Sequence, residues 1–314
     1  MDRMLDAGLT GPQLDRQCRV MSIAKRSLTE LANELGTDKG TTVGLAHGYT
    51  LIYDALFGTS RDQATSLMEI GLAMGGPEAG FPASRTVDDV PSVQMWHRSF
   101  PNAVVHGVDI SDCSRFQTEW FRFHQADCGD PERLTEIRRS LSDSGLSFDF
   151  IVDDGSHAAY HQQLTLLKFF PLLKPGGWYI IEDLNFSPVH LERSLPKVPT
   201  TRDLLGQVLR YGRVQAGGAF SPGEWDKVLT DAGAILTFDD AYLADLRRQF
   251  NLRANIPESA ANQRHQNSTL RRTIRGLRST WKAASGDKLS PHFARIKLAV
   301  VQKSIAAGHR VSGL

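Results

Sequence analysis

Residues 148–163 read FDFIVDDGSHAAYHQQ: an apolar run, two acids, a glycine turn and then a helical pattern. A short apolar run followed by a turn and a helix is typical of one βα unit in a parallel sheet. The same alternation recurs on both sides of this stretch. The expected strands are Ser66–Gly71, Ala103–Asp109, Phe121–Asp127, Phe148–Asp153, Gly177–Glu182, Ile235–Phe238 and Ile296–Gln302. The sequence therefore predicts an α/β fold, with a mostly parallel seven-stranded sheet and helices on both faces.

The segments outside these strands suggest how the chain is organised. Helical patterns cover Leu14–Leu35 and His47–Phe57, before the first strand, and Met74–Val90 is a long loop rich in Gly, Pro and small residues. Long loops in compact domains are often functional. Three parts are expected: an N-terminal helical cap over 1–60, the α/β core over 61–250, and a basic extension over 251–314 that includes the last strand at about 295–303.

The composition excludes several classes of protein. Hydrophobic residues make up 41% and charged residues 23%, close to the soluble globular average, which excludes disordered and fibrous classes. No apolar run approaches the roughly 18 residues that a membrane-spanning helix needs, and the first residues lack the apolar core of a signal peptide. The 3 cysteines include no CxxC pair, which argues against a disulfide framework or a cysteine-rich zinc site. These features predict a soluble cytoplasmic protein.

The net charge of +1 is unevenly distributed, because residues 251–314 hold twelve Lys and Arg against two acids. Within that segment, Ile274, Leu277 and Trp281 fall at helical spacing among the bases. A basic amphipathic helix can pack on an acidic neighbour in the same chain or another subunit, or lie on an anionic membrane. We expect packing, in a homo-oligomer, with peripheral membrane contact as the alternative. Nucleic-acid binding is not expected, since no recognition motif accompanies the charge.

Residues 69–76, EIGLAMGG, follow the first expected strand. Glycines there let the backbone turn tightly and approach a ligand closely. The GxGxxG pattern of dinucleotide sites is absent, and the ExGxxxG spacing suits S-adenosylmethionine better. Asp109, ending the second strand, can accept hydrogen bonds from both ribose hydroxyls, and Asp127, ending the third, is placed to meet an adenine amino group. Each feature alone also fits a simple turn or a solvated strand end; together they favour an adenosine-containing cofactor.

Acids also gather at the ends of the fourth and fifth expected strands. Asp154 follows the fourth strand, and Glu182 and Asp183 close the fifth. Three carboxylates that converge repel one another unless a cation lies between them, and oxygen ligands suit Mg²⁺ rather than Zn²⁺. The alternative is a set of separate acids that face water. His157 would stand beside the ion as a general base, whereas His161, one helical turn further on, is expected to be structural.

Several of these motifs closely resemble the class I, metal-dependent O-methyltransferases that act on sugar hydroxyls of macrolides and related glycosides. The resemblance covers about residues 34–185 and rests on EIGxxxGG, FPNAVVHGVDI, DDGSHxxxHQ and KPGGWYIIEDL. The segment GTDKG at 36–40, followed by HGY at 47–49, is similar to that family's N-terminal signature. Cephalosporin-hydroxylase-like proteins share much of the pattern. Residues 91–96 and the absence of a large extra N-terminal domain depart from some relatives, which leaves the acceptor open.

The resemblance implies a Rossmann-like methyltransferase fold and a set of site residues. Asp154, Glu182 and Asp183 would bind Mg²⁺, and His157 would be the base, with Asp154 acting in catalysis through the ion. The residues assigned to the cofactor S-adenosylmethionine are Glu69, Gly71, Asp109, Asp127 and Asp153, and those that would shape the cofactor and acceptor pocket are Thr37, Lys39 and Tyr49.

The expected function is methyl transfer from S-adenosylmethionine to a sugar hydroxyl of a glycosylated natural product or glycolipid. An alcohol is a poor nucleophile, so a bound Mg²⁺ and a base would both assist its deprotonation. Two alternatives stay open: a Mg²⁺-dependent methyltransferase of a small catechol or phenol, and a hydroxylase-like protein that binds S-adenosylmethionine without methyl transfer.

Overall fold

The seven expected strands lie side by side in one sheet, in the order β3-β2-β1-β4-β5-β7-β6. They were placed in a computed structural model that describes residues 26–43, 46–73, 75–215, 220–256 and 295–305. The strands are β1 (Ser66–Ile70), β2 (Val104–Asp109), β3 (Phe121–Gln125), β4 (Phe148–Asp153), β5 (Leu173–Ile181), β6 (Ala232–Asp239) and β7 (Ile296–Lys303). Strands β1 to β5 pair in parallel, and β7 runs antiparallel to both β5 and β6. The predicted mixed, mostly parallel sheet is confirmed.

Two strands begin earlier than the sequence predicts. β5 begins at Leu173 rather than Gly177, because Leu173 pairs with Phe148 ahead of an irregularity in the register with β4. β6 starts at Ala232 and continues through Asp239, because it pairs with β7 along that length. The KPGG turn at 174–177 predicts a later start for β5, and the short apolar run at 235–238 predicts a later start for β6.

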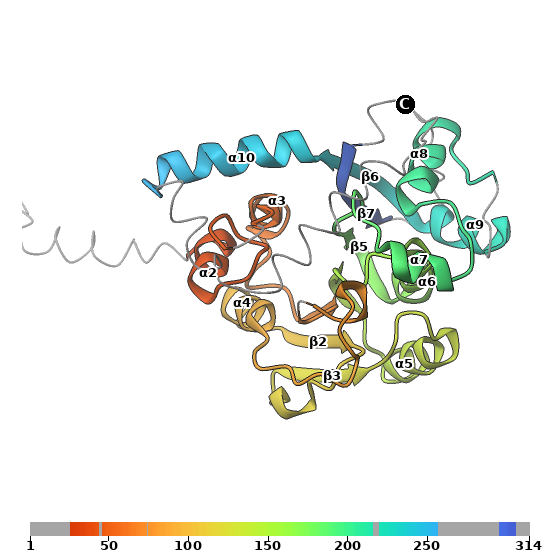
Figure 1. The fold of residues 1–314 in the computed structure, drawn as a ribbon, viewed down its shortest axis with the longest axis horizontal. Coiled ribbons are helices and arrows are strands. Elements are labelled where there is room, and N and C mark those ends of the chain that lie inside the picture. The colour runs from red at the N-terminus through yellow and green to blue at the C-terminus, as the bar shows by residue number, and fades with distance from the viewer. Residues whose placement is uncertain (1–25, 44–45, 74, 216–219, 257–294, 306–314) are drawn as a thin grey trace, which may run out of the picture.

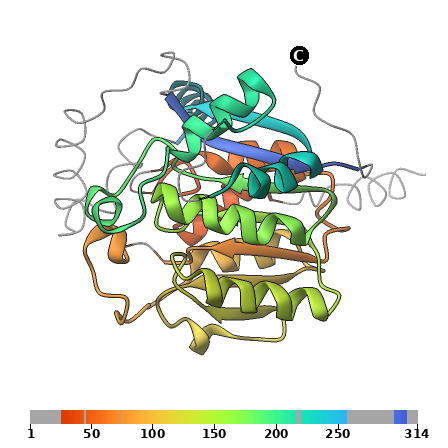
Figure 2. The same cartoon turned by 90° about the vertical axis from the view of Figure 1, so that its right-hand side faces the viewer.

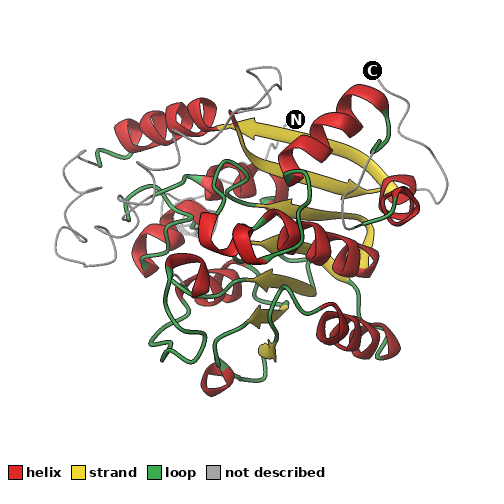
Figure 3. Ribbon diagram, turned by 45° about the vertical axis from the view of Figure 1, so that its right-hand side comes forward, coloured by secondary structure: helices red, strands yellow, loops and turns green. Residues whose placement is uncertain are grey.

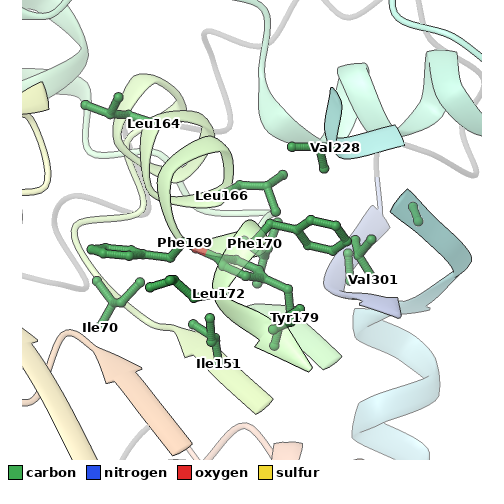
Figure 4. Packing of buried hydrophobic residues seen from close by; sticks show 14 of the residues in the cluster. Ile70, Ile151, Leu164, Leu166, Phe169, Phe170, Leu172, Tyr179, Val228 and Val301 are labelled. Atoms are coloured by element: carbon green, nitrogen blue, oxygen red, sulfur yellow. The ribbon is translucent and has the colours of Figure 1, made fainter. Parts of the chain in front are cut away.

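Helices cover one face of the sheet through a large apolar cluster, shown in part in Figure 4. These helices are α5 (Pro131–Asp143), α6 (Ala159–Phe169), α8 (Thr201–Tyr211) and α9 (Pro222–Asp231). Alternate strand residues point toward this face, among them Ile70, Ile151 and Tyr179. In Figure 4, Phe169, Phe170 and Leu172 lie between the strands and the helix that carries Leu164 and Leu166. This side of the sheet is therefore closed by the predicted crossover helices.

The opposite face carries a second cluster, formed by α2 (Leu28–Leu35), α3 (Tyr49–Phe57), α4 (Pro91–Ser99) and α10 (Asp240–Arg253). Aromatic rings dominate it: Phe57 stacks on Phe150 of β4 at 4.3 Å between ring centroids, and Trp96 lies 5.6 Å from the same ring. Figures 1 and 3 show the strands as a central layer with helices to both sides, and Figure 2 views the α5 and α6 side. The described part of the predicted cap thus forms one layer of the core.

The basic extension is only partly described. Its predicted strand is present as β7, which lies between β5 and β6. The predicted amphipathic segment at 271–285 lies outside the described residues, so its proposed packing or membrane contact stays a prediction. Among the helices that the structure describes, none is long and apolar enough to cross a bilayer.

The order of the strands determines where a ligand site is expected in the sheet. The chain moves from β1 outward to β2 and β3, and then returns to β4 on the other side of β1. In open α/β sheets, ligands bind beyond the carboxyl ends of the strands at such a reversal. The turns after β1 and β4 therefore form the centre of the expected crevice.

A pair of histidines on β2 and β3 gives a pH-dependent contribution to stability. His106 is buried, its Nδ1 lies 3.0 Å from Nε2 of His124, and burial, with lesser contributions from His124 and Arg122, lowers its pKa from 6.5 to about 4. A lowered histidine pKa favours the folded state fully above pH 6.5, and this advantage is lost as the pH falls toward about 4. We expect the wild type to lose about 2 kcal/mol more stability than His106→Gln between pH of about 8 and about 5. Urea unfolding at both pH values measures this difference, and equal losses would contradict it.

Candidate active site

A cavity of about 470 Å³ opens at the carboxyl ends of the strands. This volume lies within the usual range of small-molecule sites, roughly 300–1,000 Å³. Eight of the predicted site residues line it: Thr37, Lys39, Gly71, Asp109, Asp127, Asp154, His157 and Asp183. The cavity lining does not include Glu69, Asp153 or Glu182, because buried partners hold these acids.

Gly71 allows the ends of β1 and β4 to approach closely. Its backbone lies in the left-handed region, with φ of +83°, and a Cβ atom there would lie 2.1 Å from the carbonyl oxygen of Asp154. The Asp154 amide donates to the carbonyl of Ile70 at 2.8 Å. Any larger residue at position 71 would push the Asp154 turn away from β1. The glycine was predicted as a cofactor residue, and the structure shows that it also sets the position of Asp154.

Asp109 is fixed at the end of β2 by backbone donors. One carboxylate oxygen accepts from the Leu72 amide at 2.8 Å, and the other accepts from the Ser111 amide at 2.7 Å. The side chain is 6% exposed and faces the cavity. Asp127, by contrast, is exposed at the cavity edge and accepts from the Gly129 amide at 2.8 Å. Both acids line the cavity, and their contacts with a cofactor stay a prediction.

Asp154, His157 and Asp183 come together at one point of the cavity. One ligand atom from each lies within 4.8 Å of the other two. His157 and Asp183 both have left-handed backbones, with φ of +62° and +51°. Non-glycine residues in this region cost of order 1 kcal/mol or more and cluster at functional sites. His157 lies two residues ahead of α6 rather than on it, so the turn itself aims the ring.

Asp183 is held in its charged form. Tyr49 donates its hydroxyl to Asp183 Oδ1 at 2.7 Å, and Nδ1 of His47 lies 3.5 Å from the same oxygen. Burial on its own raises the pKa of Asp183, but His47, His157 and Lys297 together with the Tyr49 bond hold that pKa below its ordinary value. His47 also stacks on Tyr49, with 5.0 Å between the ring centroids. A buried carboxylate kept ionised is suited to bind a cation.

Lys39 lines the cavity, but the contacts of its ammonium are with buried carboxylates, and its role in the cofactor pocket stays a prediction. Its ammonium contacts both oxygens of Glu182 at 3.0 Å, Glu69 at 3.4 Å, and Asp154. Tyr53 donates a further hydrogen bond to Glu182. Glu182 thus shares the Lys39 ammonium with Asp154 and is not part of the group of Asp154, His157 and Asp183, and its role as a metal ligand stays a prediction.

Glu69 and Asp153 are also held inside the core. Glu69 accepts from the Ser92 hydroxyl at 2.8 Å, and burial raises its pKa to about 7. Asp153 lies on the α6 face of the sheet, where the hydroxyls of Thr165 and Tyr179 donate to one of its oxygens. Burial raises the Asp153 pKa to about 6. The structure thus places both predicted cofactor acids behind the cavity wall.

Ser92 and Thr165 were not predicted as partners of these acids. Each is a polar residue among the buried residues of a helix, Ser92 on α4 and Thr165 on α6. A buried hydroxyl on a helix indicates a nearby acceptor, because buried polar groups are nearly always hydrogen-bonded. A buried hydroxyl therefore indicates that an acceptor is present, but it does not identify the acceptor.

His161 lies beside the cavity but outside the Asp154 group. Its Nδ1 is 2.6 Å from the Ser156 hydroxyl oxygen, and the ring is 7% exposed. This bond braces the turn that carries His157. The contact agrees with the structural role expected for His161.

The donor set fits a divalent cation and an adenosine-containing ligand. Asp154 and Asp183 offer carboxylate oxygens, the ligands that Mg²⁺ prefers, and the left-handed backbone at Asp183 holds one of them in place. The cavity extends from this group to Asp109 and Asp127, which offer acceptors for hydroxyl and amino groups.

Known proteins share both the sequence and the fold of this core. The chain is 38% identical over 163 residues to 8-demethyl-8-alpha-L-rhamnosyl tetracenomycin-C 2'-O-methyltransferase of Streptomyces olivaceus. It is 38% identical over 156 residues to L-olivosyl-oleandolide 3-O-methyltransferase of Streptomyces antibioticus. Over half of its length, this chain is thus similar in sequence to these two O-methyltransferases. The matched regions cover 51% and 50% of this chain but only 38% and 36% of these relatives, and no protein-family model matches.

This chain is also similar in fold to a solved structure, that of the MycE methyltransferase from the mycinamycin biosynthetic pathway in complex with Mg and SAH. The TM-score is 0.52 at 27% identity, covering 68% of this chain and 53% of that chain. The sheet order, with β7 antiparallel between β5 and β6, is that of the class I methyltransferase fold. The predicted Rossmann-like fold is confirmed.

Proposed function

We propose that this chain is an S-adenosylmethionine-dependent O-methyltransferase that acts on a sugar hydroxyl of a glycosylated natural product, assisted by Mg²⁺. The observation that carries the proposal is the convergence of Asp154, His157 and Asp183 at one end of the cavity, with Asp109 at the other. The relatives support it, since their names describe methyl transfer to sugar positions of glycosylated compounds. The complex of the similar structure with Mg and SAH supports both the ion and the cofactor.

Each side chain has a defined part in this reaction. Asp154 and Asp183 would hold the ion, with Glu182 as the third predicted ligand, and Tyr49 and His47 fix the orientation of Asp183. His157 lines the cavity beside Asp154 and Asp183, where its imidazole would take the proton of the acceptor hydroxyl. When bound, S-adenosylmethionine supplies the methyl group, and the ion supplies positive charge that favours the deprotonated hydroxyl. Asp109 holds the cofactor end of the cavity, so the chain mainly orients the two reactants.

Methyl transfer from labelled S-adenosylmethionine to a panel of glycosides tests this function. We expect labelled glycoside with Mg²⁺, loss of transfer with EDTA, and recovery when Mg²⁺ is added in excess. Transfer to catechols but not to glycosides would favour the phenol alternative. Cofactor binding without transfer to any acceptor would favour a hydroxylase-like protein and would contradict the proposal.

Asp109→Asn tests the cofactor end of the cavity separately. The carboxylate accepts from two backbone amides, whereas an amide side chain has one acceptor oxygen and must turn its NH₂ toward one donor. The turned side chain no longer offers a carboxylate to the ribose hydroxyls. A hydrogen bond to a charged group is worth about 1.5–3 kcal/mol, so we expect the Kd for S-adenosylhomocysteine to rise at least about tenfold. Isothermal titration calorimetry measures it, with Asp143→Asn on the exposed side of α5 as the control for the charge change. An unchanged Kd in Asp109→Asn would remove this residue from the cofactor site.

A further inference from the structure

Lys39 is a buried cation in contact with three carboxylates. Its side chain is 2% exposed, and those of Glu69, Glu182 and Asp154 are 0%, 1% and 20% exposed. The ammonium reaches Asp154 and Glu182 across 115 and 143 residues of sequence. Among the described residues, every recorded ion pair of these three acids is with Lys39. The single positive charge of Lys39 therefore pairs with acids at the ends of β1, β4 and β5.

The backbone around Lys39 is pinned, so its ammonium is not a mobile counterion. The carbonyl of Lys39 accepts from both the amide and the hydroxyl of Thr50 at 3.1 Å, at the start of α3. The carbonyl of Asp38 accepts from the His47 amide at 2.8 Å. These hydrogen bonds join residues 38–39 to residues 47–50, the segment that also carries Tyr49. The ammonium is therefore presented from a rigid base.

Asp154 belongs to two clusters at once. Its Oδ2 atom bonds the Lys39 ammonium, and the same carboxylate lies with His157 and Asp183 in the candidate metal group. Rotation of the Asp154 carboxylate would break the contact with Lys39. Glu182, the neighbour of Asp183, is held by the same ammonium. Lys39 thus links the fixed acids of the core to the acids of the cavity.

We propose that the Lys39 ammonium is a tethered cation of the metal site, which orients Asp154 toward the ion and compensates the buried charges of Glu182 and Glu69. The inference rests on the proposed function, since it assumes that Asp154 and Asp183 bind a divalent ion. It assigns Lys39 to the metal end of the cavity rather than to the cofactor, as a positioning residue.

When the Lys39 charge is removed, a positioning role predicts weaker cation binding, whereas simple charge repulsion predicts stronger cation binding. Removing a positive charge near a cation site strengthens cation binding through simple Coulomb attraction. Removing a residue that orients a ligand weakens it, because Asp154 gains rotational freedom and the buried acids lose their partner. Lys39→Met keeps most of the apolar stem and removes only the charge. We expect its Kd for Mn²⁺, used as a probe for Mg²⁺, to rise at least about tenfold.

Lys297→Met is the matched control. Lys297 lies 5.5 Å from the ring of Tyr49 and 3.3 Å from Asp240, and its charge acts on Asp183. No recorded ion pair joins it to Asp154 or Glu182 among the described residues. Removing this lysine changes the charge of the region by the same amount without releasing Asp154. We expect its Kd for Mn²⁺ to stay the same or to fall.

The experiment is a titration of the intact protein with Mn²⁺, followed by electron paramagnetic resonance of the free ion. Circular dichroism and thermal unfolding of each variant confirm that it folds. Lys39→Ala provides a second readout, because methylammonium fits the space left by the side chain. We expect methylammonium to restore Mn²⁺ affinity in Lys39→Ala, and sodium at equal ionic strength to have no such effect.

The possible outcomes distinguish a failure of the proposed role of Lys39 from a failure of the proposed function. A wild-type protein that takes up no Mn²⁺ overturns the metal site and the inference together. Normal wild-type uptake with an unchanged or lower Kd in folded Lys39→Met overturns only the role of Lys39. Weakened binding in Lys39→Ala that methylammonium does not restore also overturns it, because the loss then comes from altered packing.

Discussion

Turnover of the His157→Ala variant is expected to fall by about 100-fold or more, because general bases contribute about 10²–10⁴-fold to catalysis. The imidazole lies beside Asp154 and Asp183 on a left-handed turn, where it can take the proton of a hydroxyl bound at that point. Alanine keeps the backbone of the turn and removes only the base. Binding of S-adenosylhomocysteine is therefore expected to change by less than about twofold. Initial rates of methyl transfer and calorimetric binding together measure both effects.

His97→Ala is the control for the loss of a histidine. His97 stacks on Trp120 at 3.8 Å between ring centroids, on α4 and outside the cavity lining. We expect its turnover to match the wild type. Near-normal turnover in His157→Ala would show that the hydroxyl loses its proton elsewhere.

Gly71→Ala is expected to have the largest effect on folding and on the site together. The added Cβ would lie 2.1 Å from the Asp154 carbonyl oxygen, and the backbone is already left-handed. Left-handed strain and overpacking together cost about 3 kcal/mol. Because the clash is with the backbone of the Asp154 turn, that turn must move away from β1. We expect a lower free energy of unfolding and at least about a tenfold loss of Mn²⁺ affinity in the protein that still folds.

Gly145→Ala separates the clash from the backbone strain. Gly145 has φ of +70°, and a Cβ there would meet no atom within 4 Å. Its substitution is expected to cost about 1 kcal/mol and to leave Mn²⁺ binding unchanged. Urea unfolding of both variants measures the difference. Equal destabilisation of the two would mean that the turn after β4 tolerates a side chain at position 71.

The sequence predicted the sheet well because its strands are short, apolar and followed by turns. It predicted the convergence of Asp109, Asp127, Asp154 and Asp183 for the same reason, since the carboxyl ends of parallel strands share one edge. Their positions follow from the order of the elements and need no knowledge of side-chain packing.

The direction in which each acid points could not be predicted in the same way. Asp153 and Asp154 are adjacent, yet Asp153 faces α6 inside the core and Asp154 faces the cavity, because β4 ends between them. A shift of one residue at a strand end exchanges the two faces. The sequence treated both as site residues because nothing local distinguishes them.

Lys39 shows the same limit over a longer range. Its partners lie 115 and 143 residues away, and the packing of α3 against the sheet brings them together. The motif around it resembles a family signature, which predicted a pocket residue but not its contacts. A single lysine near several buried acids indicates an ion pair only once the fold is known.

The central claim is a divalent ion between Asp154 and Asp183 with the cofactor beside it. Anomalous diffraction from a crystal grown with Mn²⁺ and S-adenosylhomocysteine tests this claim most directly. The account predicts one strong anomalous peak in contact with both carboxylates, adjacent to His157, and the nucleoside near Asp109. An ordered S-adenosylhomocysteine with no anomalous peak at these two acids would contradict it.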